Sequence, residues 1–319
     1  MKVLVTGANG FTGSHLVQAL VNRGDSVVAF VRKSSDVSRL ANCPVTYAYG
    51  DITDGASLQA AMVGVDIVCH TAAYVELGVV NDALMERVNV DGTRMVLQAA
   101  QQAGVTKFLY CSTIGIYGDT QGQVVDETFE RTQKSFSSSY DRTKYEAQLL
   151  VDRAACDGFH TISVMPSGIF GADDPHFGPV IRAFRNGKLK VWAGSDRITG
   201  IVHVDDLVAG MFLALDQAPS GSHYILSSGE VTTRDMFEVL GTELGIPAPQ
   251  EIPEGLVRLA GNILDPIGRI FNWQPPLSRE RVHYIYDRCV RIDGSKACRE
   301  LGWSPRPIQQ TLRECVEGL

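Results

Sequence analysis

The sequence predicts an α/β fold built on a doubly wound parallel sheet, and three observations lead to this prediction. Short β-branched runs alternate with longer helical patterns through the first half of the chain, which is the order of repeated βαβ units. The runs are almost continuously apolar, as expected for strands that helices cover on both faces. A glycine-rich turn joins the first run to the first helical pattern.

The predicted elements follow one another in regular order. Strands are expected where β-branched and aromatic residues cluster, at Lys2–Thr6, Ser26–Val31, Val45–Tyr49, Asp66–His70, Lys107–Ser112 and Thr161–Met165. Helices are expected where apolar residues recur at helical spacing, at Gly13–Asn22, Ser57–Met62, Met85–Ala103 and Ser139–Cys156. This order predicts helices on both faces of the sheet.

The composition argues against several classes of protein. A net charge of −7 disfavours nucleic acid as the principal partner. The seven cysteines are scattered without a C-x-x-C pair, which favours a reduced, cytoplasmic protein over a disulfide scaffold or zinc module. The histidines show no metal-binding spacing, so no metal site is expected. No run of 18 apolar residues occurs, so no membrane span is expected.

The glycine-rich turn, Thr6–Gly13, has the sequence TGANGFTG and lies between the first strand and the first helix. This is the context that a dinucleotide site requires. Glycines permit the tight turn and let the backbone approach a pyrophosphate, which the N–H groups of the helix N-terminus can bind. The turn therefore predicts a nucleotide cofactor.

The end of the second strand indicates which dinucleotide binds. An acidic residue at this point accepts hydrogen bonds from a ribose 2′-hydroxyl, but here Arg32 and Lys33 follow Val31. The guanidinium of Arg32 suits a 2′-phosphate, although both cations also fit a solvated loop. We therefore expect NADP(H) in preference to NAD(H).

The regular order of elements ends near residue 171, where glycine and proline begin to interrupt the pattern. We therefore divide the chain into a dinucleotide-binding domain, residues 1–171, and a mainly substrate-binding region, residues 172–319, with some segments returning to the sheet. The apolar segment Leu256–Phe271 is predicted to be a helix. It fits a substrate-pocket lid, a membrane-surface helix or part of the core, and the core is the interpretation that we favour.

Tyr140 and Lys144 are four residues apart, so a helix over Ser139–Cys156 places both side chains on one face. Reduction of a carbonyl by hydride requires a proton at the oxygen, and a tyrosine hydroxyl can deliver it. A nearby ammonium favours the phenolate, so we expect Lys144 to bring the pKa of Tyr140 closer to neutral pH. The pair alone is a weak signal, because the same spacing also arises by chance.

Several motifs in the same order resemble the extended short-chain dehydrogenase/reductase family, over nearly the whole chain. They are Thr6–Gly13, Asp51–Ile52, His70–Ala73, Asn89–Thr93, Ser112–Gly118, Tyr140 with Lys144, Pro166–Gly171, His203–Leu207 and Asp293–Lys296 followed by Leu301–Trp303. This resemblance implies a Rossmann-type doubly wound parallel sheet with a smaller mixed C-terminal substrate-binding region. It also implies a homodimer through the helices at Met85–Ala103 and Ser139–Cys156.

The resemblance further implies a set of site residues. The catalytic residues would be Thr113, which binds the substrate oxygen, Tyr140, which donates the proton, and Lys144, which also holds the nicotinamide ribose. The cofactor-binding residues would be Gly7, Gly10, Phe11, Thr12, Gly13, Arg32, Lys33, Asp51, Ile52, Thr71, Ala72, Ala73, Asn89, Tyr140, Lys144, Pro166 and Ile169.

Other interpretations of these residues stay open. Ser112 fits the part assigned to its neighbour Thr113, and Asp51 fits a cap of the following helix as well as a contact to adenine. Asn89 fits a brace for the sheet equally well. His203 is expected to be structural rather than catalytic.

Two departures from the family pattern indicate the branch. Nucleotide-sugar epimerases usually have an asparagine where this chain has Gly168, and an Arg-Asp pair where it has Thr199–Gly200, although Arg197 lies close enough in sequence to compensate. We therefore expect an NADPH-dependent reductase of an aldehyde or ketone, resembling the dihydroflavonol-reductase-like branch. The alternatives are a nucleotide-sugar epimerase or dehydratase, a 3β-hydroxysteroid-type dehydrogenase and a non-catalytic NADP(H) sensor.

Overall fold

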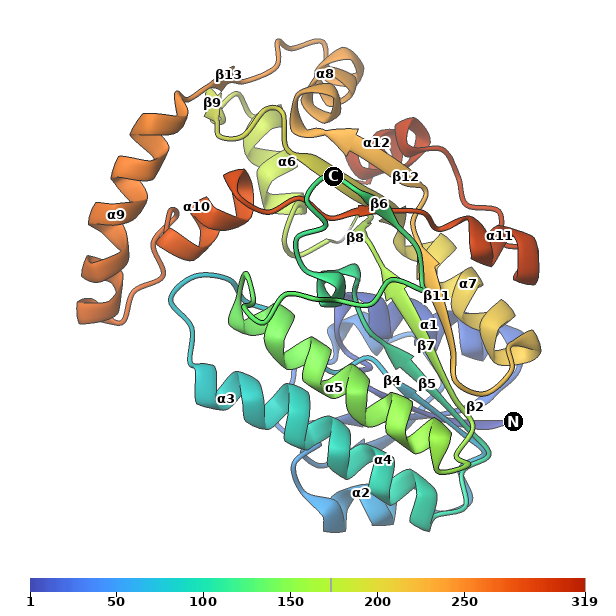
Figure 1. Ribbon diagram of the computed structural model, residues 1–319. Helices are drawn as coiled ribbons and strands as arrows, with labels where there is room; N and C mark the ends of the chain where they lie inside the picture. Colours follow the sequence, from blue (N-terminus) through green and yellow to red (C-terminus); the bar gives the residue numbers. More distant parts are fainter. Residues whose placement is uncertain (173, 319) are drawn as a thin grey trace.

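A parallel sheet of seven strands forms the centre of the part that the computed structural model describes, residues 1–172 and 174–318 (Figure 1). The strands lie in the order β11-β7-β5-β4-β1-β2-β3, and each neighbouring pair is parallel. Their bounds are β1 Lys2–Thr6, β2 Ser26–Val31, β3 Thr46–Tyr49, β4 Ile67–His70, β5 Lys107–Cys111, β7 Thr161–Pro166 and β11 Ser222–Leu226. The predicted fold class is confirmed.

Helices cover both faces of this sheet, which explains why its strands are apolar on both sides. One face packs against α1 (Phe11–Arg23), α7 (Val204–Gln217) and α11 (Ser295–Leu301) through a buried cluster that includes Leu16, Leu207 and Met211. The other face packs against α2 (Gly55–Ala61), α4 (Gly92–Gln102) and α5 (Ser139–Cys156), around Leu58, Val96 and Val151.

The strand order reverses direction at β1, which lies between β2 and β4. At such a switch point the connections leave toward opposite faces, so a crevice opens outside the carboxyl ends of the strands. The glycine-rich turn follows β1 and therefore lies at this crevice. A continuous helical stretch borders the same edge and consists of α3 (Asp82–Glu86), the π-helical turn η2 (Arg87–Asp91) and α4.

The C-terminal region builds small sheets above the carboxyl edge (Figure 1). One sheet holds β8 (Gly168–Phe170), β10 (Ile198–His203) and β12 (Gly229–Thr232), and mixes parallel and antiparallel pairs. Two-stranded pairs join β9 (Val191–Trp192) to β13 (Gln250–Glu251) and β6 (Val124–Val125) to β14 (Arg291–Ile292). The helices of this layer are α6 (Gly178–Arg185), α8 (Thr233–Leu244) and α12 (Ile308–Glu317). Short 3-10 turns lie earlier in the chain, at Ser38–Leu40 after β2 and at Ile114–Tyr117 after β5.

Residues His203–Leu207 have structural contacts, as expected. The ring of His203 accepts the backbone N–H of Asp205 at 3.2 Å and so caps α7. Asp206 forms an ion pair with Arg306 at 3.0 Å, and its carbonyl accepts the indole N–H of Trp303 at 2.8 Å. These bonds join α7 to the C-terminal segment.

Helix α9 (Glu254–Phe271) and helix α10 (Arg279–Tyr286) form a hairpin that stands away from the sheet (Figure 1). The interpretation of this segment as core is wrong, because its large apolar side chains face outward: Ile270 is 76% exposed and Phe271 75%. Gly261 lies against Val282 of α10, where a β-carbon would come within 2.6 Å. Among the described residues, no helix has the length and apolar character needed to span a membrane.

Candidate active site

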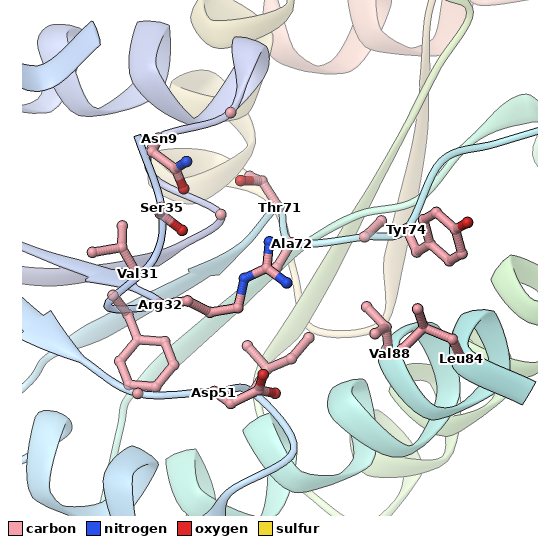
Figure 2. Close-up of a pocket in the computed structure, with 16 residues that line it drawn as sticks. Asn9, Val31, Arg32, Ser35, Asp51, Thr71, Ala72, Tyr74, Leu84 and Val88 are labelled. Carbon is pink, nitrogen blue, oxygen red and sulfur yellow. The ribbon is translucent and has the colours of Figure 1, made fainter. Parts of the chain in front are cut away.

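A cavity of about 440 Å³ opens at the switch point, outside the carboxyl ends of β1, β2 and β4 (Figure 2). Figure 2 shows Arg32 and Asp51 on one side of this cavity and Tyr74 on the other. Many of the predicted cofactor-binding residues line it, namely Gly7, Gly10, Arg32, Asp51, Ile52, Thr71, Ala72 and Ala73.

The glycine-rich turn has the close backbone packing that a dinucleotide site requires. Gly7 has φ +66°, and a β-carbon there would lie 2.8 Å from the backbone of Ala72. A β-carbon on Gly13 would lie 2.1 Å from the Gly7 carbonyl oxygen. Helix α1 starts after Gly10 with no side-chain cap and no acidic residue in its first turn. Its first N–H groups therefore suit a pyrophosphate, and the residues present fit a dinucleotide.

Other predicted cofactor residues lie outside the lining of this cavity. Phe11 packs edge-on against the ring of His15, with centroids 5.3 Å apart, while Thr12 continues the first turn of α1. Lys33 is exposed beside Arg32. Pro166 ends β7, and Ile169 lies in β8 beside Val202.

Asp51 accepts hydrogen bonds from Thr53, from the backbone N–H at 2.9 Å and from the hydroxyl at 2.8 Å. Burial raises the pKa of Asp51, but these hydrogen bonds and the positive charges of Arg32 and Arg87 outweigh it, so the pKa lies below its ordinary value. Asp51 is therefore an ionised hydrogen-bond acceptor near Arg32.

Asn89 is a brace in this structure, which is one of the two interpretations left open. Its Oδ1 accepts the backbone N–H of Tyr74 at 2.7 Å, and its Nδ2 donates to the carbonyl of Tyr74 at 3.1 Å and to the hydroxyl of Thr143 at 3.0 Å. The side chain is buried. It thereby ties the cavity wall at Tyr74 to helix α5.

His70 connects the glycine-rich turn to the helix bordering the cavity. Its Nδ1 lies 2.7 Å from the hydroxyl of Thr6, and its Nε2 lies 3.0 Å from the hydroxyl of Thr93. Burial, with a smaller contribution from the charge of Lys144, lowers the pKa of His70 to about 3. The ring is therefore neutral at ordinary pH.

Tyr140 and Lys144 lie in the first turns of α5, which Ser138 caps by accepting the backbone N–H of Asp141 at 3.0 Å. The ammonium of Lys144 donates to the hydroxyl of Tyr110 at 2.7 Å and to the carbonyl of Cys111 at 2.8 Å. Burial lowers the pKa of Lys144 to about 8. Tyr110 is not among the predicted site residues, and its only signal in the sequence is its place in β5 shortly before Ser112 and Thr113.

The expected effect of Lys144 on the pKa of Tyr140 is not what the structure shows. Burial raises the pKa of Tyr140, the neighbouring Cys111, Asp141 and Tyr284 raise it further, and the Thr113 side chain opposes them only in part. The prediction that Lys144 brings the pKa of Tyr140 closer to neutral pH is therefore wrong here, because the lysine ammonium is engaged by Tyr110 and Cys111 and burial dominates. Tyr140 is a protonated phenol at ordinary pH.

Thr113 and Ser112 follow β5 on the same edge. The Thr113 oxygen accepts the backbone N–H of Gly115 at 3.1 Å and caps the 3-10 turn there. Its hydroxyl proton remains available for donation. The hydroxyl oxygen of Ser112 is buried, and among the described residues it has no hydrogen-bond partner.

Comparison with known proteins decides which family this site belongs to. Residues 3–227 match the NAD dependent epimerase/dehydratase family. The chain belongs to that family. It is therefore an enzyme of the extended short-chain dehydrogenase/reductase type, with the nicotinamide dinucleotide site that is typical of the family.

Three relatives match this family member over almost its whole length. The "Sterol demethylase protein B" of Methylococcus capsulatus is 32% identical over 99% of the chain and 97% of the relative. A 4-hydroxy-2-methyl-3-oxo-4-farnesyl-3,4-dihydroquinoline-1-oxide ketoreductase of Stigmatella aurantiaca is 33% identical over 97% and 94%. A putative dihydroflavonol 4-reductase of a Synechocystis species is 31% identical over 98% and 92%.

A solved structure has the same arrangement of chain. The crystal structure of gox2253 superimposes with a TM-score of 0.85 at 30% identity, over 99% of this chain and 97% of the other. An NAD(P)-dependent oxidoreductase or epimerase activity follows from family membership, and the substrate does not.

Proposed function

We propose that this enzyme is an NADPH-dependent reductase that transfers hydride to an aldehyde or ketone carbonyl, like the dihydroflavonol-reductase-like branch of its family. The observation that carries this proposal is the protonated phenol of Tyr140 beside the Thr113 hydroxyl, at the carboxyl edge that bears the glycine-rich turn. The relatives named as a ketoreductase and as a dihydroflavonol reductase support the same reaction class.

When bound, NADPH would supply the hydride. In that reaction, the Tyr140 phenol donates its proton to the carbonyl oxygen as negative charge develops there. The Thr113 hydroxyl donates a hydrogen bond to the same oxygen and orients it. The raised pKa of Tyr140 keeps the proton on the phenol before the reaction.

Lys144 has a separate part in this mechanism. It is held by Tyr110 and Cys111 in this structure, one helical turn from Tyr140. Its ammonium stabilises the phenolate that proton donation leaves behind, and the ribose hydroxyls of the cofactor are its second expected partner. Burial that lowers its pKa to about 8 limits this stabilisation at high pH.

The proposal includes three further expectations. Residues 1–171 would carry most of the cofactor contacts and residues 172–319 most of the substrate contacts. The enzyme would form a homodimer through the helices at Met85–Ala103 and Ser139–Cys156, and it would be cytoplasmic. Light scattering of the purified enzyme tests the dimer.

A panel of aldehydes, ketones and sugar nucleotides, followed at the NADPH absorbance band, tests the proposed reaction. We expect NADPH consumption with a carbonyl compound. In Tyr140→Phe, turnover should fall by about 10²- to 10⁴-fold, the usual contribution of a general acid, with NADPH affinity unchanged. Full activity in this variant, or tight UDP-sugar binding without net NADPH consumption, would contradict the proposal.

A further inference from the structure

A second cavity, of about 210 Å³, lies in the C-terminal region between β10, α8 and α10. Aromatic and aliphatic side chains form most of its wall, including Phe177, Trp192, Met236 and Ile285. Among its described lining residues, Arg197 carries the charge. The cavity therefore combines an apolar wall with one guanidinium.

The backbone of Arg197 is held in place by hydrogen bonds, while its guanidinium lies over the ring of Tyr284. The backbone N–H donates to the carbonyl of Gly194 at 3.1 Å, and the Arg197 carbonyl accepts the N–H of Thr233 at 2.9 Å. The guanidinium carbon lies 4.8 Å from the ring centroid of Tyr284. Within residues 1–172 and 174–318, the guanidinium has no ion pair or hydrogen bond. A partly buried cation in this position favours an anionic ligand.

The other cation on the same ring is already compensated. The Arg288 guanidinium lies 4.3 Å from the Tyr284 centroid and forms an ion pair with Asp141 at 3.1 Å. Both side chains of that pair are buried, with 6% and 1% exposure. One positive charge, that of Arg197, therefore remains without a counter-charge next to the cavity.

These residues also connect the cavity to the candidate proton donor. Asp141 follows Tyr140 in α5, and Tyr284 lies close enough for its hydroxyl to raise the pKa of Tyr140. Tyr284 thus lies near both Tyr140 and Arg197. A substrate with its carbonyl at Tyr140 would extend past Tyr284 toward the cavity.

We propose that this cavity binds the remote end of the substrate, an apolar body with a single carboxylate that pairs with Arg197. The proposal rests on the reductase function above and assigns the substrate class. A carboxylate can accept two parallel hydrogen bonds from a guanidinium. A nucleotide diphosphate fits less well, because its second charge would stay uncompensated against an apolar wall.

Binding of a carboxylate and its neutral isostere tests this assignment without turnover. Trp192 lines the cavity, so its fluorescence can report titration with 2-naphthoate and with 2-naphthamide. We expect 2-naphthoate to bind the wild-type enzyme on the order of tenfold more tightly, as one charged hydrogen-bonded pair supports. Arg197→Gln should make the two affinities equal by weakening 2-naphthoate alone.

Two further variants keep the test interpretable. Arg197→Lys retains the charge and should keep part of the preference, even if the glutamine variant folds poorly. Arg313→Gln removes an exposed arginine that pairs with Glu243 near the C-terminal end of α8, outside the described lining of the cavity, and should leave the preference unchanged.

Three results would overturn the assignment: equal affinities in the wild type, a preference that survives in Arg197→Gln, or Arg197-dependent binding of UDP tighter than that of 2-naphthoate. Failure of the reductase proposal gives a different result. In that case the naphthoate preference is present while no carbonyl compound consumes NADPH. NADPH consumption without any carboxylate preference would leave the reductase standing and reject only the anion site.

Discussion

Tyr140 and Lys144 share one face of α5 and yet lie in different electrostatic environments. Burial and nearby groups raise the pKa of Tyr140, so the phenol keeps its proton. The Lys144 ammonium is buried with the hydroxyl of Tyr110 and the carbonyl of Cys111 as its acceptors. This resting arrangement suits an acid that donates first and a cation that stabilises the phenolate afterwards.

At the same scale, Arg32 is the residue that we propose distinguishes NADPH from NADH. Its exposed side chain lines the dinucleotide cavity at the end of β2, where no acidic residue follows the strand. Arg32→Ala should weaken NADPH binding by at least about tenfold and leave NADH binding nearly unchanged, because only NADPH carries the 2′-phosphate. Titration of cofactor fluorescence measures both affinities.

Lys33→Ala is the matched control for this prediction. Lys33 is also exposed, but it lies outside the described lining of the cavity, so its removal should have the smaller effect. Equal losses of NADPH and NADH affinity in Arg32→Ala would show that the cofactor preference has another origin.

Among the elements, α9 departs most clearly from the sequence-based expectation. The apolar residues of α9 that face inward are few and small: Val257, Gly261 and Gly268 are buried, and Gly261 lies against α10. Its larger side chains, Leu256, Leu259, Ile263, Ile267, Ile270 and Phe271, are exposed. The helix is therefore held to α10 by close backbone approach at Gly261 and by polar bonds such as the Arg279 N–H to Asp265 at 3.2 Å, rather than by a large apolar face.

This arrangement predicts that two substitutions in one helix change the free energy of unfolding by different amounts. Ile270→Ser should change the free energy of unfolding by less than about 0.5 kcal/mol, because the side chain is 76% exposed. Val257→Ala should cost about 1–2 kcal/mol, because Val257 is fully buried. Urea denaturation of both variants provides the comparison. A larger loss in Ile270→Ser would mean that a partner covers this face in solution.

For the whole molecule, the buried His70 predicts acid sensitivity. Its pKa is lowered to about 3 in the folded state, while an unfolded histidine titrates near 6.5. Between these two pH values the unfolded chain binds one more proton than the folded protein. The contribution of neutral His70 to the free energy of unfolding is therefore fully present above about pH 6.5 and is lost as the pH falls toward 3. The loss should reach several kcal/mol, as the difference between the two values implies.

Urea denaturation between pH 7 and pH 4 can isolate this contribution. His70→Asn should be less stable at pH 7 and lose less stability on acidification than the wild type. His176→Gln is the control, because His176 is exposed and its replacement leaves the buried His70 in place. The same acid loss in His70→Asn as in the wild type would assign the sensitivity to other groups.

The sequence alone determined the order of elements, the glycine-rich turn and the placement of Tyr140 and Lys144 on one helix. These features depend on local periodicity and on backbone requirements that neighbouring residues express directly. The strand Lys2–Thr6 and the helix Ser139–Cys156 have the predicted bounds for this reason.

Only the tertiary structure decided how those residues are used. It placed Tyr110 against Lys144, Asn89 against Tyr74, and two arginines against the ring of Tyr284, through contacts across long stretches of chain. It also left the apolar face of α9 uncovered. A pKa depends on burial and on every charge nearby in space, and burial depends on which elements pack together. Neither is encoded in local spacing, so the protonated state of Tyr140 and the uncompensated charge of Arg197 became visible only in the folded chain.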